Sequence, residues 1–156
     1  MLYIHGIGLF HPSNVIDNDF LTQLDIGTDD EWITSRTGIK TRYTNLSLDY
    51  IRCTLNADPC NAVGDMEYTS AQTSAMAAKK ALLQARISKD QIGSIVAGTS
   101  SPEFNIPTMS CTVAKELELK VPSFDLNSAC STFVTQLHAI NNMMPEATAD
   151  YILLIV

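Results

Sequence analysis

Residues 124–133 read FDLNSACSTF, and this stretch decides how the whole chain is interpreted. It begins with apolar residues typical of a buried strand and continues through small residues into a run that favours helix. Such a rapid passage from strand to helix places Cys130 at the N-terminus of the helix. Its neighbours Ser128, Ala129 and Ser131 are small, so we expect the approach to the thiol to be open.

A cysteine in this position can act as a nucleophile. The aligned backbone dipoles and free N–H groups at a helix N-terminus favour the thiolate over the thiol. The same N–H groups could stabilise an oxyanion, and hydrolases place their nucleophile at a similar elbow between strand and helix. From the residues alone a second interpretation stays open, in which Cys130 is a small buried residue at a tight turn.

The segments around this stretch predict an α/β layered fold. Continuous apolar runs predict strands at 3–10, 92–98, 121–126 and 151–156. Good helix formers predict helices over 70–86, 108–117 and 131–144. The third helix has apolar residues at helical spacing, namely Phe133, Leu137, Ile140 and Met144. Apolar strands that alternate with helices are typical of sheets buried on both faces.

Residues 11–69 are less regular. Asp17 and its neighbours supply cap residues for a short helix through Leu24. Thr28 and Glu31 have the spacing of a capping box that opens a helix through Ser35. The stretch 44–68 is rich in Asn, Pro and Gly and predicts a long surface loop with room for a short helix.

Composition excludes several classes of protein. With 156 residues, 46% of them hydrophobic and 17% charged, the chain fits one domain or half of a larger one. A net charge of -7 argues against nucleic-acid binding, because no basic stripe is available for phosphates. No apolar run reaches the roughly 18 residues of a membrane span, and the first ten residues lack the basic start of a signal peptide. We therefore expect a cytoplasmic protein.

The four cysteines do not predict a disulfide framework or a metal site. The chain lacks secretory features, and Cys53 and Cys60 do not have zinc spacing. We expect these two and Cys111 to be ordinary reduced thiols. The chain ends within an apolar strand at 151–156, so we also expect a second half that covers it, supplied by more chain or by a partner.

Three ordered motifs resemble the 3-oxoacyl-acyl-carrier-protein synthase III family. Residues 28–42 read TDDEWITSRTGIKTR and resemble the signature near that family's N-terminus. Residues 98–108 read GTSSPEFNIPT and resemble its loop after the central strand. Residues 125–133, DLNSACSTF, resemble its nucleophile motif. Their order and spacing match, and the resemblance covers about the first half of a family member.

The resemblance implies the N-terminal half of a thiolase-like layered fold, with helices on the faces of a mixed sheet. It implies an acyltransferase of fatty acid biosynthesis, in which acyl-coenzyme A acylates Cys130 and the acyl group then condenses with malonyl-acyl-carrier-protein. No cofactor is implied beyond the coenzyme A thioester, which is a substrate. The implied partners are acyl-coenzyme A, the acyl carrier protein and a second copy in a homodimer.

The resemblance also assigns binding residues. Trp32 would stack on the adenine of coenzyme A, Arg36 would lie near the nucleotide, and Thr28 matches a further position at coenzyme A. Ile106 and Phe133 would line the acyl pocket. Independently of any family, Trp32 and Arg36 are one helical turn apart and can share a face.

Departures from the family pattern leave alternatives open. Thr132 stands where the family usually has Gly, and Ile106 where a Phe is common, so Ile106 predicts a longer or branched acyl primer. The family's catalytic His and Asn lie in its second half, and His5, His11 and His138 do not match that motif.

Two other functions are therefore compatible with the sequence. One is an orphan half that is inactive alone and serves as an assembly partner. The other is a relative that transfers acyl groups to oxygen or nitrogen acceptors in secondary metabolism.

Overall fold

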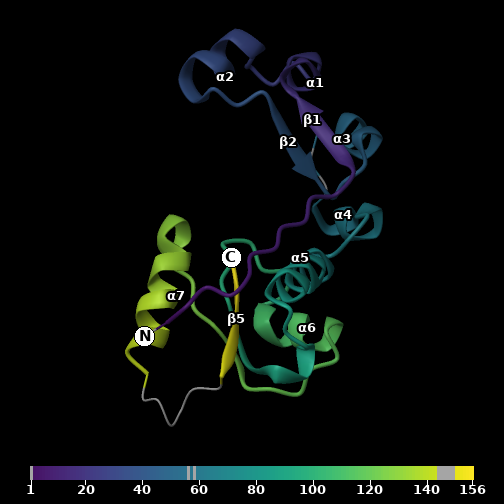
Figure 1. The fold of residues 1–156 in the computed structure, drawn as a ribbon. Helices are drawn as coiled ribbons and strands as arrows, with labels where there is room; N and C mark the ends of the chain where they lie inside the picture. The colour runs from purple at the N-terminus through teal and green to yellow at the C-terminus, as the bar shows by residue number, and fades with distance from the viewer. Residues whose placement is uncertain (1, 56, 58, 144–149) are drawn as a thin grey trace. The chain divides into compact units, whose positions relative to one another are not determined.

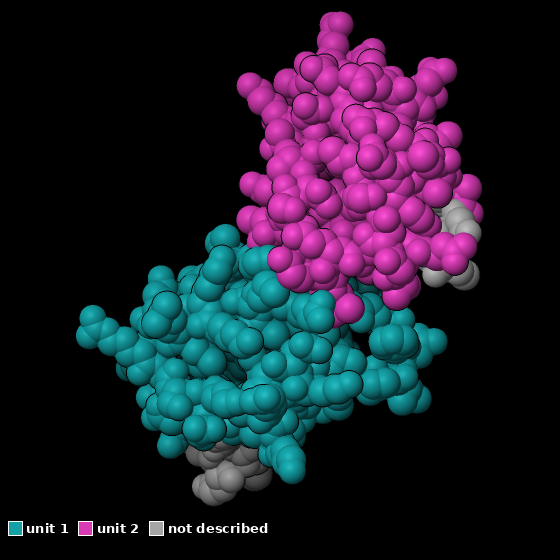
Figure 2. Space-filling view, turned by 90° about the vertical axis from the view of Figure 1, so that its right-hand side faces the viewer, with its two compact units in different colours: residues 1–10, 70–156 teal, residues 11–69 magenta. Residues whose placement is uncertain are grey.

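The computed structural model describes residues 2–55, 57, 59–143 and 150–156, which form two compact units. The first unit consists of residues 1–10 and 70–156, and the second of residues 11–69 (Figure 2). Cys130 belongs to the first unit, and Trp32 and Arg36 belong to the second. Each unit has its own strands and its own buried residues, so each is described by itself.

The first unit is built on a three-stranded parallel sheet in the order β4-β3-β5. Its strands are β3 (Ile92–Ala97), β4 (Ser123–Asp125) and β5 (Tyr151–Ile155). Its helices are α5 (Ser70–Ala85), α6 (Met109–Glu116) and α7 (Thr132–Asn141). In Figure 1, α7 lies on one side of the strands, and α5 and α6 lie on the other. The expected α/β layering is confirmed; Met144 lies outside the described residues.

Alanines on one face of α5 explain how closely this helix packs. Ala71, Ala75 and Ala78 are buried at the spacing of successive helical turns. They form one hydrophobic cluster with residues of β3, α6 and β5, which include Ile95 and Val113, both fully buried. Because alanine side chains are short, the backbone of α5 comes near its neighbours without leaving a void.

The predicted strand at 3–10 is wrong. The segment is assigned to no strand, and β3 pairs directly with β5. The segment lies on α5 instead: a side chain at Gly6 or Gly8 would collide with the backbone of that helix. The N–H of Ile7 donates to Gln84 Oε1 at 2.5 Å, while the side chain of Ile4 is exposed. The two glycines thus allow contact with a helix where the apolar pattern alone predicts pairing with a strand.

The second unit contains a two-stranded antiparallel sheet and four helices. The strands are β1 (Asn14–Asp17) and β2 (Thr41–Thr44), paired with Val15 opposite Tyr43. The helices are α1 (Asn18–Gln23), α2 (Asp30–Thr37), α3 (Leu48–Thr54) and α4 (Pro59–Asp65). The short helix that the sequence predicts through Leu24 corresponds to α1, which is capped by Asp17.

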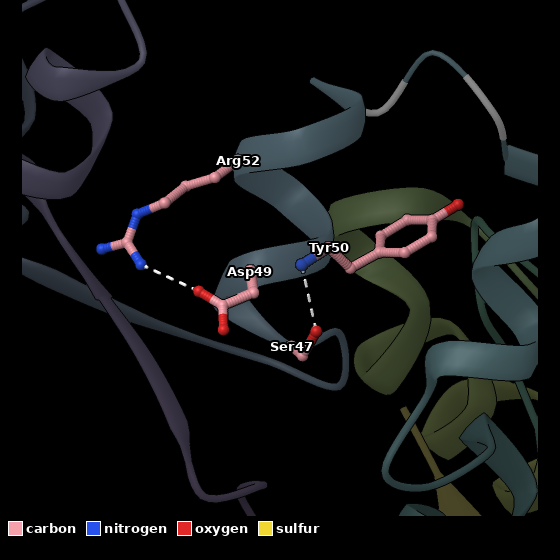
Figure 3. A network of polar contacts seen from close by, with 4 residues as sticks. All are labelled: Ser47, Asp49, Tyr50 and Arg52. Carbon is pink, nitrogen blue, oxygen red and sulfur yellow. Dashed lines mark hydrogen bonds and ion pairs between the residues drawn. The ribbon is translucent and has the colours of Figure 1, made fainter.

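The long loop predicted at 44–68 is wrong in extent, because α3 and α4 occupy most of it. Local polar contacts start α3: the hydroxyl of Ser47 accepts a hydrogen bond from the N–H of Tyr50 at 3.1 Å (Figure 3). An ion pair at 3.2 Å joins Arg52 to Asp49 one turn apart. A serine cap satisfies one of the free N–H groups at the start of a helix, which a count of loop-forming residues does not register. Among the described residues, no helix combines the length and the apolar character needed to cross a membrane.

Candidate functional site

The turn that carries Cys130 lies between the end of β4 and the start of α7. A short 3-10 helix, η2 (Ala129–Ser131), comes first, and α7 begins at Thr132. The side chain of Cys130 is exposed. The structure thus confirms the predicted position of this cysteine between strand and helix, and its role as a nucleophile stays a prediction.

Side chains of the turn hold its backbone in place. Asn127 donates from Nδ2 to the carbonyl oxygen of Thr99 at 2.9 Å and accepts from the N–H of Ala129 at 3.1 Å. The hydroxyl of Ser131 donates to the carbonyl oxygen of Ser128 at 2.8 Å. Ala129 has φ of 47°, in the left-handed region that a residue with a side chain rarely adopts. Such a conformation persists where its surroundings hold it, and it occurs often at functional sites.

Two buried polar residues of α7 form hydrogen bonds with the turn and with the strand ends beside it. Thr132 is 5% exposed and contacts the turn through its hydroxyl. Gln136 is fully buried, and its Nε2 donates to the carbonyl oxygens of Leu126 at 3.1 Å and Ile155 at 3.3 Å. Both approach Gly98, where an added Cβ would stand 2.5 Å from Thr132 Cγ2. Gln136 was not predicted from the sequence; the available signal was its place on the same helix face as the apolar Ile140, four residues on.

Hydrogen bonds to Asp125 also hold the start of α6 near this turn. The carboxylate of Asp125, the last residue of β4, accepts hydrogen bonds from the N–H groups of Met109 at 2.9 Å and Ser110 at 2.8 Å. It therefore caps α6. Ile106, which precedes that helix, is 88% exposed, and Phe133 in the first turn of α7 is 42% exposed. Both side chains can be reached from solvent, and their place in an acyl pocket stays a prediction.

The second group of predicted site residues lies on α2 or, for Thr28, just before it. This helix is capped by the carboxylate of Asp29, which accepts from the N–H of Trp32 at 2.7 Å, and it ends at Gly38 with φ of 70°. The expected cap at Thr28 is therefore wrong: the aspartate one position later reaches the free N–H groups. The hydroxyl oxygen of Thr28 is instead buried, and it has no hydrogen-bond partner within the described part of the chain.

Trp32 and Arg36 share one face of α2, as their spacing predicts. The guanidinium carbon of Arg36 lies 4.4 Å from the centroid of the Trp32 ring, and the Trp32 side chain is 48% exposed. A cation over an indole face is a favourable contact. The pair presents a flat, partly apolar surface beside a positive charge, which suits a nucleotide base and its phosphates.

Asn18 fastens α2 at both ends. Its side chain is almost completely buried; Nδ2 donates to Asp30 Oδ1 at 2.7 Å and to the carbonyl oxygen of Ile39 at 2.9 Å. Its Oδ1 accepts from Arg42 at 3.0 Å. Asn18 and Asp30 also line an open depression of about 430 Å³. Asn18 was not predicted as a site residue, because contacts to residues 12 to 24 positions away have no local signature.

These contacts set the electrostatics of α2. The hydrogen bond from Asn18, followed by the one from Thr34 at 3.1 Å, lowers the pKa of the Asp30 carboxyl below its ordinary value. Lys40 adds a smaller effect in the same direction. A negative charge on Asp30 also suits the N-terminal end of α2, where the helix dipole is positive.

The predicted residues therefore form two groups. Cys130, Ile106 and Phe133 belong to the first unit, and Thr28, Trp32 and Arg36 to the second. Among the described residues, no cluster of three or more His, Cys, Asp or Glu side chains could hold a metal ion.

Comparisons with known proteins identify relatives that match nearly the whole chain. No family model matches the chain. The beta-ketoacyl-[acyl-carrier-protein] synthase III of Clostridium perfringens (strain 13 / Type A) is 34% identical over 151 residues, which are 96% of this chain and 40% of that protein. The enzyme of the same name from Rickettsia felis is 33% identical over 153 residues, which are 97% of this chain and 42% of that protein. The chain thus spans about two-fifths of the length of the curated relatives it matches.

Solved structures agree with these sequence matches. The crystal structure of 3-oxoacyl-[acyl-carrier-protein] synthase III from Aquifex aeolicus VF5 has a TM-score of 0.76 at 31% identity, over 97% of this chain and 42% of that one. A tetronic acid condensing enzyme has a TM-score of 0.73 at 26% identity, over 96% of this chain and 41% of that one. Nearly the whole chain is therefore similar to about two-fifths of the length of 3-oxoacyl-acyl-carrier-protein synthases III.

Proposed function

We propose that Cys130 accepts an acyl group from acyl-coenzyme A, as the first step of a decarboxylative condensation of the 3-oxoacyl-acyl-carrier-protein synthase III type. The observation that carries this proposal is the exposed thiol in a constrained turn at the start of α7, in a chain related to these enzymes. Residues of this chain are proposed to carry out the acylation; the condensation is proposed as an activity of the whole protein.

The chemistry of acylation follows from the position of the thiol. The thiolate of Cys130 attacks the thioester carbonyl carbon, and a carbon–sulfur bond forms while the carbonyl oxygen takes negative charge. The start of α7 favours negative charge through its dipole. The tetrahedral intermediate then collapses, coenzyme A leaves as a thiolate that takes up a proton, and the acyl group stays on Cys130. Splitting the condensation in two makes each step easier.

Binding of coenzyme A is assigned to the face of α2. Trp32 would stack on adenine and Arg36 would pair with phosphate. The buried hydroxyl of Thr28, which has no hydrogen-bond partner among the described residues, would bond a further group of the ligand. The second substrate would be malonyl-acyl-carrier-protein, whose decarboxylation supplies the carbanion equivalent. No residue of this chain is assigned to that second step. The homodimer and the cytoplasmic location stay predictions.

The first test measures acylation of Cys130 directly. The chain is incubated with acetyl-coenzyme A or octanoyl-coenzyme A, and the acylated peptide is identified by mass spectrometry. We expect about one acyl group per chain on Cys130, none in Cys130→Ala, and unchanged acylation in the matched control Cys111→Ala, which removes another exposed thiol. Acylation of Cys130→Ala equal to that of the unmodified chain would contradict the proposal. A clear preference for acetyl would contradict the longer primer predicted from Ile106.

A second test concerns the coenzyme A face. Trp32→Ala should weaken coenzyme A binding about tenfold, because stacking of a base on an aromatic ring contributes about 1–3 kcal/mol. Trp32→Phe, which keeps an aromatic face, should weaken it less. Isothermal titration calorimetry measures both, with Tyr43→Ala as a control for loss of an exposed aromatic ring from the same unit. Equal affinities of the Ala and Phe variants would contradict stacking on Trp32.

A further inference from the structure

Thr132 occupies the first position of α7, directly below the turn that carries Cys130. Three groups of that turn surround its hydroxyl oxygen. The N–H of Ser128 donates to it at 2.9 Å, and the Asn127 Oδ1 and the carbonyl oxygen of Ala129 lie within hydrogen-bond distance, at 2.9 and 2.7 Å. One threonine hydroxyl thus contacts three successive residues.

The chemistry of a hydroxyl matches this arrangement. Its lone pairs accept the hydrogen bond from Ser128, and its single proton is shared between the two oxygen acceptors on Asn127 and Ala129. Thr132 is only 5% exposed, so water cannot readily replace these bonds. Asn127 continues the network, because it also binds the N–H of Ala129 and the carbonyl oxygen of Thr99.

The network acts on the one strained residue of the turn. Ala129 has φ of 47°, a conformation that is unfavourable for a residue with a side chain and persists only where neighbouring contacts hold it. The hydroxyl of Thr132 binds the carbonyl oxygen of this residue, and Cys130 is the next residue along the chain. Loss of the hydroxyl would therefore loosen the backbone immediately before the thiol.

We propose that Thr132 is a positioning residue for Cys130: its hydroxyl holds residues 127–129 so that the thiol stays exposed at the start of α7. The inference rests on the proposed role of Cys130 as nucleophile. The family that the sequence resembles usually has Gly at this position, and glycine has no hydroxyl. The methyl group of Thr132 is accommodated because residue 98 is a glycine.

The test measures the reactivity of Cys130 toward iodoacetamide, which needs no coenzyme A. Peptide mass spectrometry follows the alkylation rate of Cys130, with the exposed Cys53 and Cys111 of the same chain as internal references. Thr132→Val keeps the shape and removes the hydroxyl; we expect the rate at Cys130 to fall about fivefold to tenfold, as loss of a buried hydrogen bond predicts. Thr132→Ser keeps the hydroxyl and should restore most of the rate.

The matched control is Thr73→Val, which removes a hydroxyl that donates to the carbonyl oxygen of Ser70 in α5 of the same unit, at 3.0 Å. It should leave the rate at Cys130 unchanged. Equal rates for Thr132→Val and the unmodified chain would overturn the proposal. So would a Thr132→Ser rate as low as that of Thr132→Val, or a parallel fall at Cys111, which would indicate a general loss of structure.

A second variant keeps the test decisive if Thr132→Val fails to fold. Asn127 is exposed, and Asn127→Ala removes the side-chain oxygen Oδ1 that Thr132 contacts. It should slow alkylation of Cys130 as well, and an unchanged rate would overturn the proposal. Normal alkylation without acylation by acyl-coenzyme A would count against the proposed function alone, so the two failures are distinguishable.

Discussion

The turn around Cys130 and the helix α2 are held in place in different ways. The turn follows β4 of a parallel sheet whose unit contains a buried hydrophobic cluster. Side-chain hydrogen bonds hold four residues of the turn, namely Asn127, Ser128, Ala129 and Ser131. In α2 only Ile33 is buried, and one side chain, Asn18, fastens both ends of the helix. Under the roles proposed above, the thiol of Cys130 is carried by a fixed backbone, whereas the stacking surface proposed at Trp32 is partly exposed to solvent.

The two units also differ in how they are stabilised. The hydrophobic cluster that joins α5, β3, α6 and β5 lies entirely in the first unit. In the second unit, the buried residues include Ile16, Phe20, Ile33 and the polar Asn18. We therefore expect apolar packing to dominate the stability of the first unit and a buried hydrogen-bond network to contribute more in the second.

The largest expected effect is that of a cavity in the first unit. Ile95→Ala removes a fully buried side chain from β3 and should lower the free energy of unfolding by about 3 kcal/mol. Circular dichroism during urea denaturation measures this loss. Leu83→Ala, in which an 80% exposed side chain of α5 is shortened, is the control and should cost less than about 0.5 kcal/mol.

Tryptophan fluorescence sharpens this experiment, because Trp32 is the only tryptophan of the chain and reports the second unit. Since the units have separate cores, its urea midpoint should stay unchanged in Ile95→Ala. A shift of that midpoint by the same amount as the circular dichroism midpoint would show that the two units unfold together, and the comparison would fail.

An intermediate effect is expected for Asn18→Ala. The change removes three hydrogen bonds made by an almost fully buried side chain, so the second unit should lose about 2 kcal/mol of its free energy of unfolding. The fluorescence of Trp32 during urea denaturation measures it. Asp49→Asn, which breaks the exposed ion pair with Arg52 in the same unit, should cost less than about 0.5 kcal/mol. Equal losses in the two variants would contradict the role of Asn18.

The smallest effect is expected from pH. Because the pKa of the Asp30 carboxyl is lowered in the folded chain, chiefly by the hydrogen bond from Asn18, folding favours its charged form. The resulting stabilisation is fully present above the ordinary pKa of aspartate, about 3.9. It is lost as pH falls toward and through the lower folded value. The urea midpoint of Trp32 fluorescence should therefore decrease between about pH 5 and pH 3.

A matched pair of chains isolates this contribution. The pKa of Glu67 is also lowered, by the hydrogen bond from Ser13, so Glu67→Gln is introduced into both chains to remove its titration. Asp30→Asn should then show a weaker dependence of the midpoint on pH than the chain that keeps Asp30. Identical pH profiles would contradict the assignment to Asp30.

Much of the fold was predictable, because its signals are local. The helix-forming run at 70–86 and the apolar run at 92–98 agree with α5 and β3 to within one residue at each end. The contact between Trp32 and Arg36 follows from helical spacing. The position of Cys130 follows from the short passage of small residues between the strand and the helix.

Two of the errors depend on contacts that the local pattern does not show. The apolar segment at 3–10 has the composition of a strand, but its glycines let it lie on α5. The apolar spacing in α7 favours Phe133 as a core residue, yet this side chain is 42% exposed, while Thr132 and Gln136 are buried. These two polar residues are buried because their hydrogen-bond partners come from the turn and from the ends of β4 and β5.

The passage from strand to helix at Cys130 was determined by the sequence alone, since apolar runs, small residues and helix formers act through neighbours along the chain. The tertiary structure decided which groups hold that turn and which hold α2. Thr132 reaches three residues of the turn, and Asn18 contacts residues 12, 21 and 24 positions away. Hydrogen bonds of buried side chains depend on what folding brings within about 3 Å, and that distance has no counterpart in a linear pattern.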